Sequence, residues 1–273
     1  MKNNTWQSIL LGFLMVSSSV FAAEKEIALT IDDLPFVGAS RNSAYDLARK
    51  EERFMRMLDA LNQQQVPAVG FVIAGAIAKG QWELLEAFQK GGYTLGNHTY
   101  SHLNLNTTSA QKYIDNVAKA DKILTPLMTD TKYFRYPYLA EGKGEKEETV
   151  KAFLAENNYV IAPVTVDSKD YRFNNQLMRV YYKNRDNYTK TFKKTYLAYI
   201  WKQTERAEQK DVKTYGKPLP QILLIHANQL NSIVLNDIIE MYKNKGYKFV
   251  TLGEALKARS DAEVEKKDET VVQ

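Results

Sequence analysis

The 273-residue sequence contains no cysteine. Disulfide bonds, thiolate metal ligands and a lipidated N-terminal cysteine are therefore excluded. Histidine is scarce as well, because the chain has only His98, His102 and His226. Any imidazole that binds a metal ion or transfers a proton must be one of these three.

The composition also lacks a strong excess of charge and a long apolar segment in its main part. The formal net charge is +5, Lys and Glu are interleaved, and no compact Lys/Arg block suggests nucleic-acid binding. After residue 22 no stretch is long and apolar enough to cross a bilayer. With 44% hydrophobic and 11% aromatic residues, the chain has the composition of a globular protein and the length of one large α/β domain.

The N-terminus differs from the rest of the chain. Residues 1–22 contain an early Lys, an apolar run at 9–16 and small residues that end at Ala22. This pattern is typical of a secretory signal peptide, and the run is short for a membrane span; an N-terminal membrane anchor is the alternative. We therefore expect export to the periplasm or the medium, with no stable membrane insertion after cleavage.

Apolar periodicity predicts alternating strands and helices along the remaining chain. Strands are expected at 26–32, 66–73, 91–98, 132–138, 159–167, 221–226 and 247–252. Helices are expected at 42–65, 82–90, 107–124, 149–158, 237–245 and 253–258. Such repeated alternation favours a parallel α/β architecture, either open or closed.

One long segment breaks this alternation. Residues 171–221 are basic and rich in tyrosine, and a helix is expected in their second half. The segment is either an elaborated crossover with a solvated face or a substrate-facing insertion, because aromatic rings stack on sugars. We divide the chain into a signal peptide at 1–22, a main domain at 23–258 that contains this insertion, and a charged tail at 259–273 that is expected to fray.

Two histidines and two carboxylates suggest a metal site. His98 and His102 are four residues apart, a spacing that on a helical turn places both rings on one face; a pair of surface or capping histidines is the alternative. Asp32 and Asp33 end a predicted strand, and parallel strands gather functional groups at their carboxyl ends. One carboxylate with two imidazoles leaves positions open for water, as in catalytic zinc sites. Adjacent strand residues point in different directions, so the second Asp could act on that water as a base.

Five motifs together resemble those of the polysaccharide deacetylases, the NodB-homology family of carbohydrate esterases (carbohydrate esterase family 4). The resemblance rests on TIDDLP (30–35) for T-F-D-D-G-P, HTYSH (98–102) for H-[ST]-x-x-H, RYPY (135–138) for R-x-P-Y, DSKDY (167–171) for D-x-x-D-W, and LLIH (223–226) for the late motif that ends in the catalytic His. The motifs occur in the family's order, span most of the mature chain and use every histidine.

The resemblance implies a distorted (β/α) barrel of about seven parallel strands, with residues 23–258 as the deacetylase catalytic domain. It implies that Asp33, His98 and His102 bind Zn²⁺ or another divalent ion such as Co²⁺ or Ni²⁺. Asp32 would be the general base that activates a water for attack on the acetyl carbonyl.

The resemblance also implies the remaining site residues. His226 would be the general acid that protonates the leaving amine, and Asp170 would hydrogen-bond it and favour its charged form; Asp167 is the fallback for Asp170. Arg135 would form an ion pair with Asp32 and keep it ionised.

Three more residues would contact the substrate. A backbone N–H near Tyr138 would stabilise the tetrahedral oxyanion. Tyr171 and Leu224 would line a small pocket for the acetyl methyl group, although Leu224 is equally well explained as strand core.

The chain departs from the family pattern at several positions. Leu34 stands where the family usually has Gly, and we expect it to narrow the cleft or reshape the strand end. Tyr171 replaces Trp, Ile31 replaces Phe, and the late motif continues as HAN without the Asp that often follows the His. None of these changes removes a metal ligand or a proton carrier, so an active enzyme is expected.

The expected function is metal-dependent removal of acetyl groups from N-acetylated sugars in peptidoglycan or in chitin-like N-acetylglucosamine oligomers. An O-acetyl esterase, for example on acetylated xylan, would use the same residues. A non-catalytic glycan-binding module and a periplasmic metal-binding protein are further alternatives. The last would leave Asp32 and Arg135 without a role.

Overall fold

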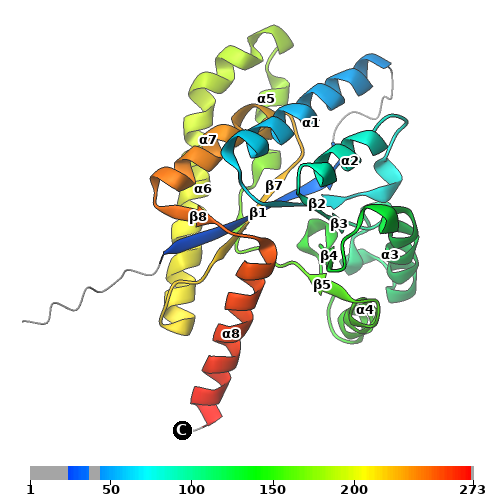
Figure 1. Ribbon diagram of the computed structural model, residues 1–273, viewed down its shortest axis with the longest axis vertical. Helices are drawn as coiled ribbons and strands as arrows, with labels where there is room; N and C mark the ends of the chain where they lie inside the picture. The colour runs from blue at the N-terminus through cyan, green and yellow to red at the C-terminus, as the bar shows by residue number, and fades with distance from the viewer. Residues whose placement is uncertain (1–23, 37–43, 272–273) are drawn as a thin grey trace, which may run out of the picture.

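The structure is a computed structural model that describes residues 24–36 and 44–271. The expected signal peptide at 1–22 lies outside the described residues. Helices surround a curled sheet (Figure 1). Helices α1 (Ala44–Gln64), α2 (Trp82–Lys90) and α7 (Asn231–Asn244) lie on one side of strand β1 (Lys25–Leu34), and helix α8 (Leu252–Val271) projects from the opposite side (Figure 1).

The sheet is parallel throughout its recorded strand pairs. The strand order is β5-β4-β3-β2-β1-β7-β6, and β8 also pairs with β1. The strands are β1 (Lys25–Leu34), β2 (Ala68–Val72), β3 (Thr94–Asn97), β4 (Lys132–Phe134), β5 (Tyr159–Ile161), β6 (Val166–Asp167), β7 (Gln221–His226) and β8 (Tyr247–Phe249). Since β5 and β6 end this order, the described sheet curls without closing. The predicted distorted barrel of about seven parallel strands is confirmed.

The helices follow the strands as the alternation predicts. They are α1 (Ala44–Gln64), α2 (Trp82–Lys90), α3 (Ala110–Leu124), α4 (Glu145–Glu156), α5 (Asp170–Arg179), α6 (Arg185–Tyr215), α7 (Asn231–Asn244) and α8 (Leu252–Val271). Short 3₁₀ turns lie at Ala74–Ala76, Leu105–Thr107, Thr125–Leu127, Pro137–Leu139 and Tyr182–Asn184. Ser109 caps α3 by accepting a hydrogen bond from the Lys112 N–H, as Ser does at helix starts.

Several predicted boundaries differ from the observed ones. The single strand expected at 159–167 is two strands, because Pro163 has no N–H and lies between β5 and β6. Helix α4 begins at Glu145 rather than residue 149, with three Glu in its first turn, where negative charge favours a helix N-terminus. Helix α7 begins at Asn231 rather than residue 237.

The predicted frayed tail was also wrong. The expected short helix at 253–258 continues as α8 to Val271, the last described residue. Arg259 fixes this helix to α6, because its guanidinium donates to both carboxylate oxygens of Asp211 at 2.9 Å. A bidentate pair of this kind, with Asp211 buried, holds the start of the tail on the domain.

The segment at 171–221 contributes to both the core and the surface. It comprises most of α5, a 3₁₀ turn and α6, which has 31 residues. Tyr196 and Ile200 of α6 are fully buried in the main hydrophobic cluster. The helix expected in the second half of the segment is confirmed. It also begins earlier than expected, because α6 already starts at Arg185.

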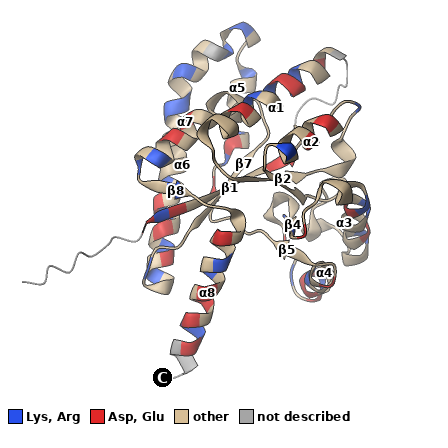
Figure 2. Cartoon of the chain, in the orientation of Figure 1, with Lys and Arg blue, Asp and Glu red and all other residues tan. Residues whose placement is uncertain are grey.

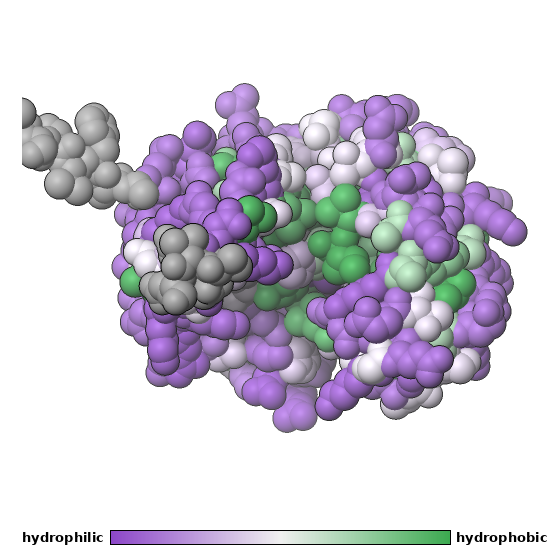
Figure 3. Space-filling model, turned by 90° about the horizontal axis from the view of Figure 1, so that it is seen from below, coloured by the Kyte–Doolittle hydropathy of each residue, from purple (hydrophilic) through white to green (hydrophobic). Residues whose placement is uncertain are grey.

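The surface shows no membrane-spanning element within residues 24–36 and 44–271, because no helix there is both long and apolar enough. Seen from below, apolar residues gather in a hollow at the middle of the face, and hydrophilic residues surround them (Figure 3). Asp32, Asp33 and His226 lie at the carboxyl ends of β1 and β7, and His98 and His102 lie in the loop after β3.

Candidate active site

The site residues predicted from the sequence come together at one cavity of about 770 Å³. Eight of the ten line it: Asp32, Asp33, His98, His102, Tyr138, Tyr171, Leu224 and His226. The other two, Arg135 and Asp170, are fully buried and contact Asp32 and His226 respectively. Eight predicted residues thus face the cavity, and the two buried ones contact Asp32 and His226 from behind.

The two adjacent carboxylates reach the same cavity because β1 is irregular at its end. A regular strand would send Asp32 and Asp33 to opposite faces. Instead, the pairing of β1 with β2 shifts between Ile31 and Leu34, and Asp33 has a left-handed backbone with φ of 68°. Asp tolerates this conformation better than most residues. The alternation of side chains along a regular strand, from which the sequence predicted different directions for Asp32 and Asp33, therefore does not explain their positions.

Leu34 does not narrow the cleft, which was one of the two effects expected of it. Its side chain is 1% exposed and lies in the main hydrophobic cluster. A Cβ atom on Gly70 of β2 would lie 2.1 Å from Leu34 Cδ1, so the space that Leu34 fills exists because residue 70 is Gly. The leucine that replaces the usual glycine of the family therefore packs in the hydrophobic core and does not enter the cavity.

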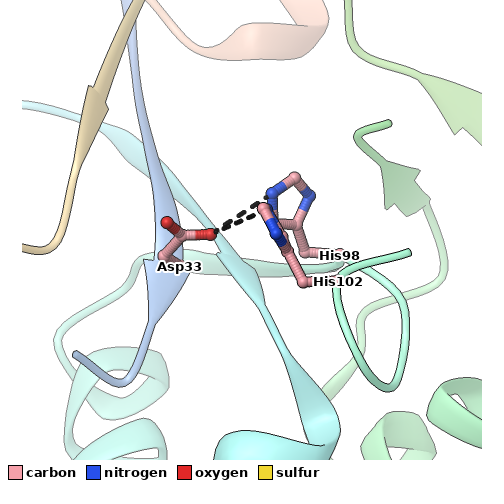
Figure 4. Close-up of side chains that lie close together, drawn as sticks. All are labelled: Asp33, His98 and His102. Carbon is pink, nitrogen blue, oxygen red and sulfur yellow. Dashed lines mark ion pairs between the residues drawn. The ribbon is translucent and has the colours of Figure 1, made fainter. Parts of the chain in front are cut away.

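Asp33, His98 and His102 form a compact triad (Figure 4). The Asp33 Oδ1 atom lies 3.4 Å from His98 Nε2 and 3.3 Å from His102 Nε2. The His98 Nδ1–H donates to the Arg135 carbonyl at 2.8 Å, which leaves the lone pair of Nε2 directed at Asp33. Asp33 Oδ1 is buried and has no hydrogen-bond partner within the described residues.

This arrangement fits a divalent cation. Ligand atoms about 2.1 Å from a tetrahedral zinc ion are about 3.4 Å apart, close to the observed spacing. Burial lowers the pKa of both His98 and His102 to about 3, so both rings are neutral, as metal ligands must be. Burial raises the pKa of Asp33 to about 7, a cost that a bound cation would offset.

The two histidines are brought together by a loop and not by the helical turn that their spacing suggests. They follow β3, and Thr99 and His102 have left-handed φ angles of 66° and 55°. Asn97 shapes this loop, because its side-chain oxygen accepts from the Thr99 N–H at 2.7 Å and its amide donates to the Val117 carbonyl at 3.2 Å. Sequence reasoning missed Asn97, although it directly precedes His98.

Asp32 lines the cavity and lies beside the buried Arg135. The Arg135 Nη1 atom is 3.5 Å from Asp32 Oδ1, and its Nε–H donates to the Ala162 carbonyl at 2.6 Å. Burial raises the pKa of Asp32, and the Arg135 charge lowers it without cancelling the rise. Arg135 thus acts in the expected direction, but burial prevails, so the Asp32 carboxylate is more basic than an exposed one.

His226 and Asp170 form a second ion pair at the end of β7. His226 Nδ1 lies 2.7 Å from Asp170 Oδ1. Burial alone would lower the pKa of His226, but the charge and hydrogen bond of Asp170 outweigh burial and raise it to about 10. Asp167, the fallback partner, instead accepts from the Lys169 N–H at 2.9 Å. The structure therefore brings Asp170, and not Asp167, to His226.

The Asp170 carboxylate has further partners that sequence reasoning missed. Its Oδ2 atom accepts from the His226 N–H at 2.7 Å and from the side chains of Asn228, at 2.8 Å, and Asn231. Tyr196 of α6 in turn donates to Asn231 Oδ1 at 3.0 Å. Asn228 is the last residue of the HAN sequence at 226–228. The sequence prediction considered this stretch only because it lacks the Asp that often follows the His in the family.

The predicted substrate-binding residues lie on different walls. Tyr138 is 65% exposed, has a φ of 59°, and its ring centroid is 4.4 Å from that of His102. Tyr171 is exposed in the first turn of α5. Leu224 is 3% exposed on β7 and also lines the cavity, so it belongs both to the strand core and to the site wall.

Solved structures of low sequence identity share the fold. The chitin deacetylase from Colletotrichum lindemuthianum matches with a TM-score of 0.58 and 24% identity, over 85% of this chain and 87% of that one. A CE4 family pseudoenzyme from Bacillus anthracis also has a TM-score of 0.58, with 19% identity over 86% of this chain and 66% of that one. The fold thus occurs both in a named deacetylase and in a protein described as a pseudoenzyme.

Curated relatives extend the similarity to the sequence. A peptidoglycan-N-acetylglucosamine deacetylase of Bacillus cereus is 32% identical over 54% of this chain and 46% of its own length. The Colletotrichum lindemuthianum chitin deacetylase is 26% identical over 84% of this chain and 79% of its own length. The chain therefore spans about half of the Bacillus cereus relative.

A family model completes the comparison. The polysaccharide deacetylase model matches residues 21–162, which is more than half of the chain. This region contains the metal-site triad, Asp32 and Arg135, whereas Asp170 and His226 lie beyond it. With its curled parallel sheet and its five ordered motifs, the chain belongs to the polysaccharide deacetylase family.

Proposed function

We propose that this protein is a metal-dependent N-deacetylase that hydrolyses the acetamide of an N-acetylated sugar in a peptidoglycan or chitin-like glycan. One observation carries the proposal: a single cavity holds Asp32 and the Asp33–His98–His102 triad together with His226, which pairs with Asp170 and whose pKa this pairing helps to raise to about 10. A base, a cation site and an acid are the three parts that amide hydrolysis by water requires. The names of the relatives support the substrate class.

Asp33, His98 and His102 would hold the ion, with Zn²⁺ proposed and Co²⁺ or Ni²⁺ as substitutes. When bound, a divalent ion polarises a carbonyl oxygen and makes a water molecule more acidic. Asp32 would accept the proton of the attacking water, a step that its raised pKa favours. Arg135 would hold the Asp32 carboxylate in place through their contact at 3.5 Å.

The remaining residues would complete the reaction. The backbone N–H of Tyr138 would donate to the oxyanion that forms when water adds to the carbonyl carbon. His226 would give its Nε2 proton to the amide nitrogen as the C–N bond breaks, which releases acetate and a free amine. Asp170, bound to Nδ1, keeps His226 charged and oriented for this transfer. Tyr171 and Leu224 would contact the acetyl methyl group.

The proposal includes export, on the basis of the N-terminal pattern at residues 1–22. Expression of the full-length chain in a bacterial host, followed by mass measurement of the protein outside the cytoplasm, would test it. A mass that corresponds to cleavage after Ala22 is expected. Retention of residues 1–22 on a membrane-bound protein would support the anchor alternative.

The central experiment measures acetate release from N-acetylglucosamine oligomers and from peptidoglycan. The chelated protein and the same protein with zinc restored are compared, with Asp32→Asn as the inactive control. We expect zinc-dependent release that Asp32→Asn abolishes. Release from O-acetylated xylan alone would replace the proposal by an O-acetyl esterase. Zinc binding and glycan binding without any release would mean a binding module on this fold.

A further inference from the structure

One wall of the active-site cavity carries positive charge that the proposed reaction does not use. Arg49 and Arg53 lie one helical turn apart on α1, and Arg185 lies at the start of α6; all three line the cavity. Residues four apart share one face of a helix, so both α1 guanidiniums can face the cavity. Lys and Arg recur along α6 and on α1 (Figure 2).

Two of these guanidiniums meet at one neutral acceptor. The Gln229 Oε1 atom accepts from Arg53 Nη2 at 2.6 Å and from Arg185 Nη1 at 3.4 Å. Arg185 is held further by the Val180 carbonyl at 2.9 Å and the Met178 carbonyl at 3.0 Å. Because the Arg53 and Arg185 side chains are already held by these hydrogen bonds, they lose little conformational entropy when a ligand binds.

The charges of this wall are not neutralised by ion pairs. Within the described side chains, the ion pairs include none between a carboxylate and Arg49, Arg53 or Arg185. Asp46 also lines the wall and offsets part of its charge. Burial, together with the charges of Arg49 and Arg185, lowers the pKa of Arg53 to about 10. Three cations crowded in this way would be stabilised by an anion.

The wall is also joined to the reacting centre. Gln229 follows His226 by three residues, so their Cα atoms are at most about 10 Å apart. Asn228 lies between them and binds Asp170. When the acetamide of a glycan lies between the Asp33–His98–His102 triad and His226, the arginines are therefore within reach of a neighbouring sugar on the His226 side of the cavity.

We propose that Arg49, Arg53 and Arg185 bind a carboxylate carried by the sugar next to the one that is deacetylated. Guanidinium groups pair with carboxylates in two-pronged, charge-assisted hydrogen bonds. The inference rests on the proposed function and narrows it: glycans with carboxylate-bearing sugars are preferred to neutral chitin-like oligomers. A lactyl ether and a uronic acid both supply this chemistry.

Two matched pairs of probes separate these sources. One pair is peptide-free peptidoglycan strands, which carry free lactyl carboxylates, and the same strands with the carboxylates reduced to alcohols. The other is an oligosaccharide that alternates N-acetylglucosamine with a uronic acid, and its carboxyl-reduced form. Binding is measured by calorimetry with chelated protein, so that no turnover interferes, and kcat/KM is measured with zinc.

We expect at least one carboxylate form to bind roughly tenfold more tightly than its reduced partner, as charge-assisted hydrogen bonds allow. Added salt should reduce this ratio. Arg49→Gln should bring the ratio toward one, and Arg49→Lys, which keeps the charge, should retain part of it. Arg56→Gln is the matched control, because Arg56 is exposed on the same helix and paired with Glu52 at 2.6 Å.

The outcomes separate the two proposals. Equal affinity for both members of each pair, or a ratio that Arg49→Gln and Arg53→Gln leave unchanged, would overturn the inference even if acetate is released. Carboxylate-dependent binding that the Arg variants abolish, without acetate release from any probe, would uphold the anion site and reject the deacetylase.

Discussion

Two regions of the cavity, the Asp33–His98–His102 triad and the His226–Asp170 pair, satisfy their polar groups in opposite ways. At the Asp33–His98–His102 triad, two neutral imidazoles face a buried carboxylate oxygen that has no hydrogen-bond donor in the described structure. At the other side, the Asp170 carboxylate pairs with a charged His226 and accepts from two asparagines. The first arrangement fits a cation from solution, whereas the second carries its own counter-charge.

This difference predicts which side depends on added metal. A buried carboxylate without hydrogen-bond donors raises the free energy of the folded state until a cation binds to it. Metal binding at the triad should therefore increase the free energy of unfolding. The His226–Asp170 pair should keep its structure with or without the ion.

Loss of a triad ligand should have the largest effect. His98→Ala is expected to weaken zinc binding by more than about 100-fold and to abolish acetate release, because three protein ligands become two. Zinc titration with a competing chelator measures the first and an acetate assay the second. His226→Ala is the matched control and should keep its zinc affinity. Equal zinc affinity in His98→Ala and wild type would contradict the triad.

Asp32→Asn should keep the metal and lose turnover. The amide cannot accept the proton of the attacking water, and general bases contribute about 10² to 10⁴ in rate. The volume of the side chain hardly changes, so the contact with Arg135 should hold the residue in place. If Asp32→Asn lost zinc while Asp33→Asn kept it, the roles of the two carboxylates would be reversed.

Asp170→Asn should lower the pKa of His226 from about 10, since the charge of Asp170 is the main cause of the rise. Because the folded-state pKa lies above the ordinary value of 6.5, the pair stabilises the fold fully below pH 6.5. That contribution is lost as the pH rises through about 10. The difference in unfolding free energy between wild type and Asp170→Asn should therefore shrink between pH 6 and pH 10.

Two measurements check this third prediction. NMR titration of the His226 ring should give the pKa shift directly, and chemical unfolding at several pH values should give the stability difference. Asp167→Asn is the control and should leave the His226 titration unchanged, because Asp167 binds Lys169. An unshifted His226 in Asp170→Asn would refute the pairing.

Leu34→Gly should have the smallest effect on chemistry. It restores the residue usual in the family but removes a buried side chain, which costs roughly 2–5 kcal/mol in unfolding free energy. Since Leu34 does not line the cavity, kcat/KM on N-acetylglucosamine oligomers should change little. A large gain in activity would mean that Leu34 does restrict the cleft.

The sequence predicted the elements and the site residues better than it predicted how they meet. Strand β7 and helix α2 were predicted with their observed bounds, because each is a short apolar or amphipathic run between clear breaks. The side chains of the five motifs were expected at one cavity, and eight of the ten proposed residues line it. Parallel topology explains this success, since it places strand ends on one edge.

Local backbone irregularities account for most of what the sequence did not show. The left-handed angles at Asp33 and His102 depend on tertiary contacts, and no periodicity encodes them. Asn97, Asn228 and Asn231 act through hydrogen bonds that only the folded chain reveals. Helix α8 was shortened in the prediction because its charged sequence gave no sign of the Arg259–Asp211 pair.

The hydrogen bond from Tyr196 to Asn231 has a consequence for protein engineering. Tyr196 comes from the long helix α6, and Asn231 donates to the Asp170 carboxylate that pairs with His226. The segment at 171–221 and the late motif are therefore linked through this contact. A chimera that replaces residues 171–221 with a short loop from another family member should also import that member's late motif, because it would otherwise lose a support of the Asp170–His226 pair.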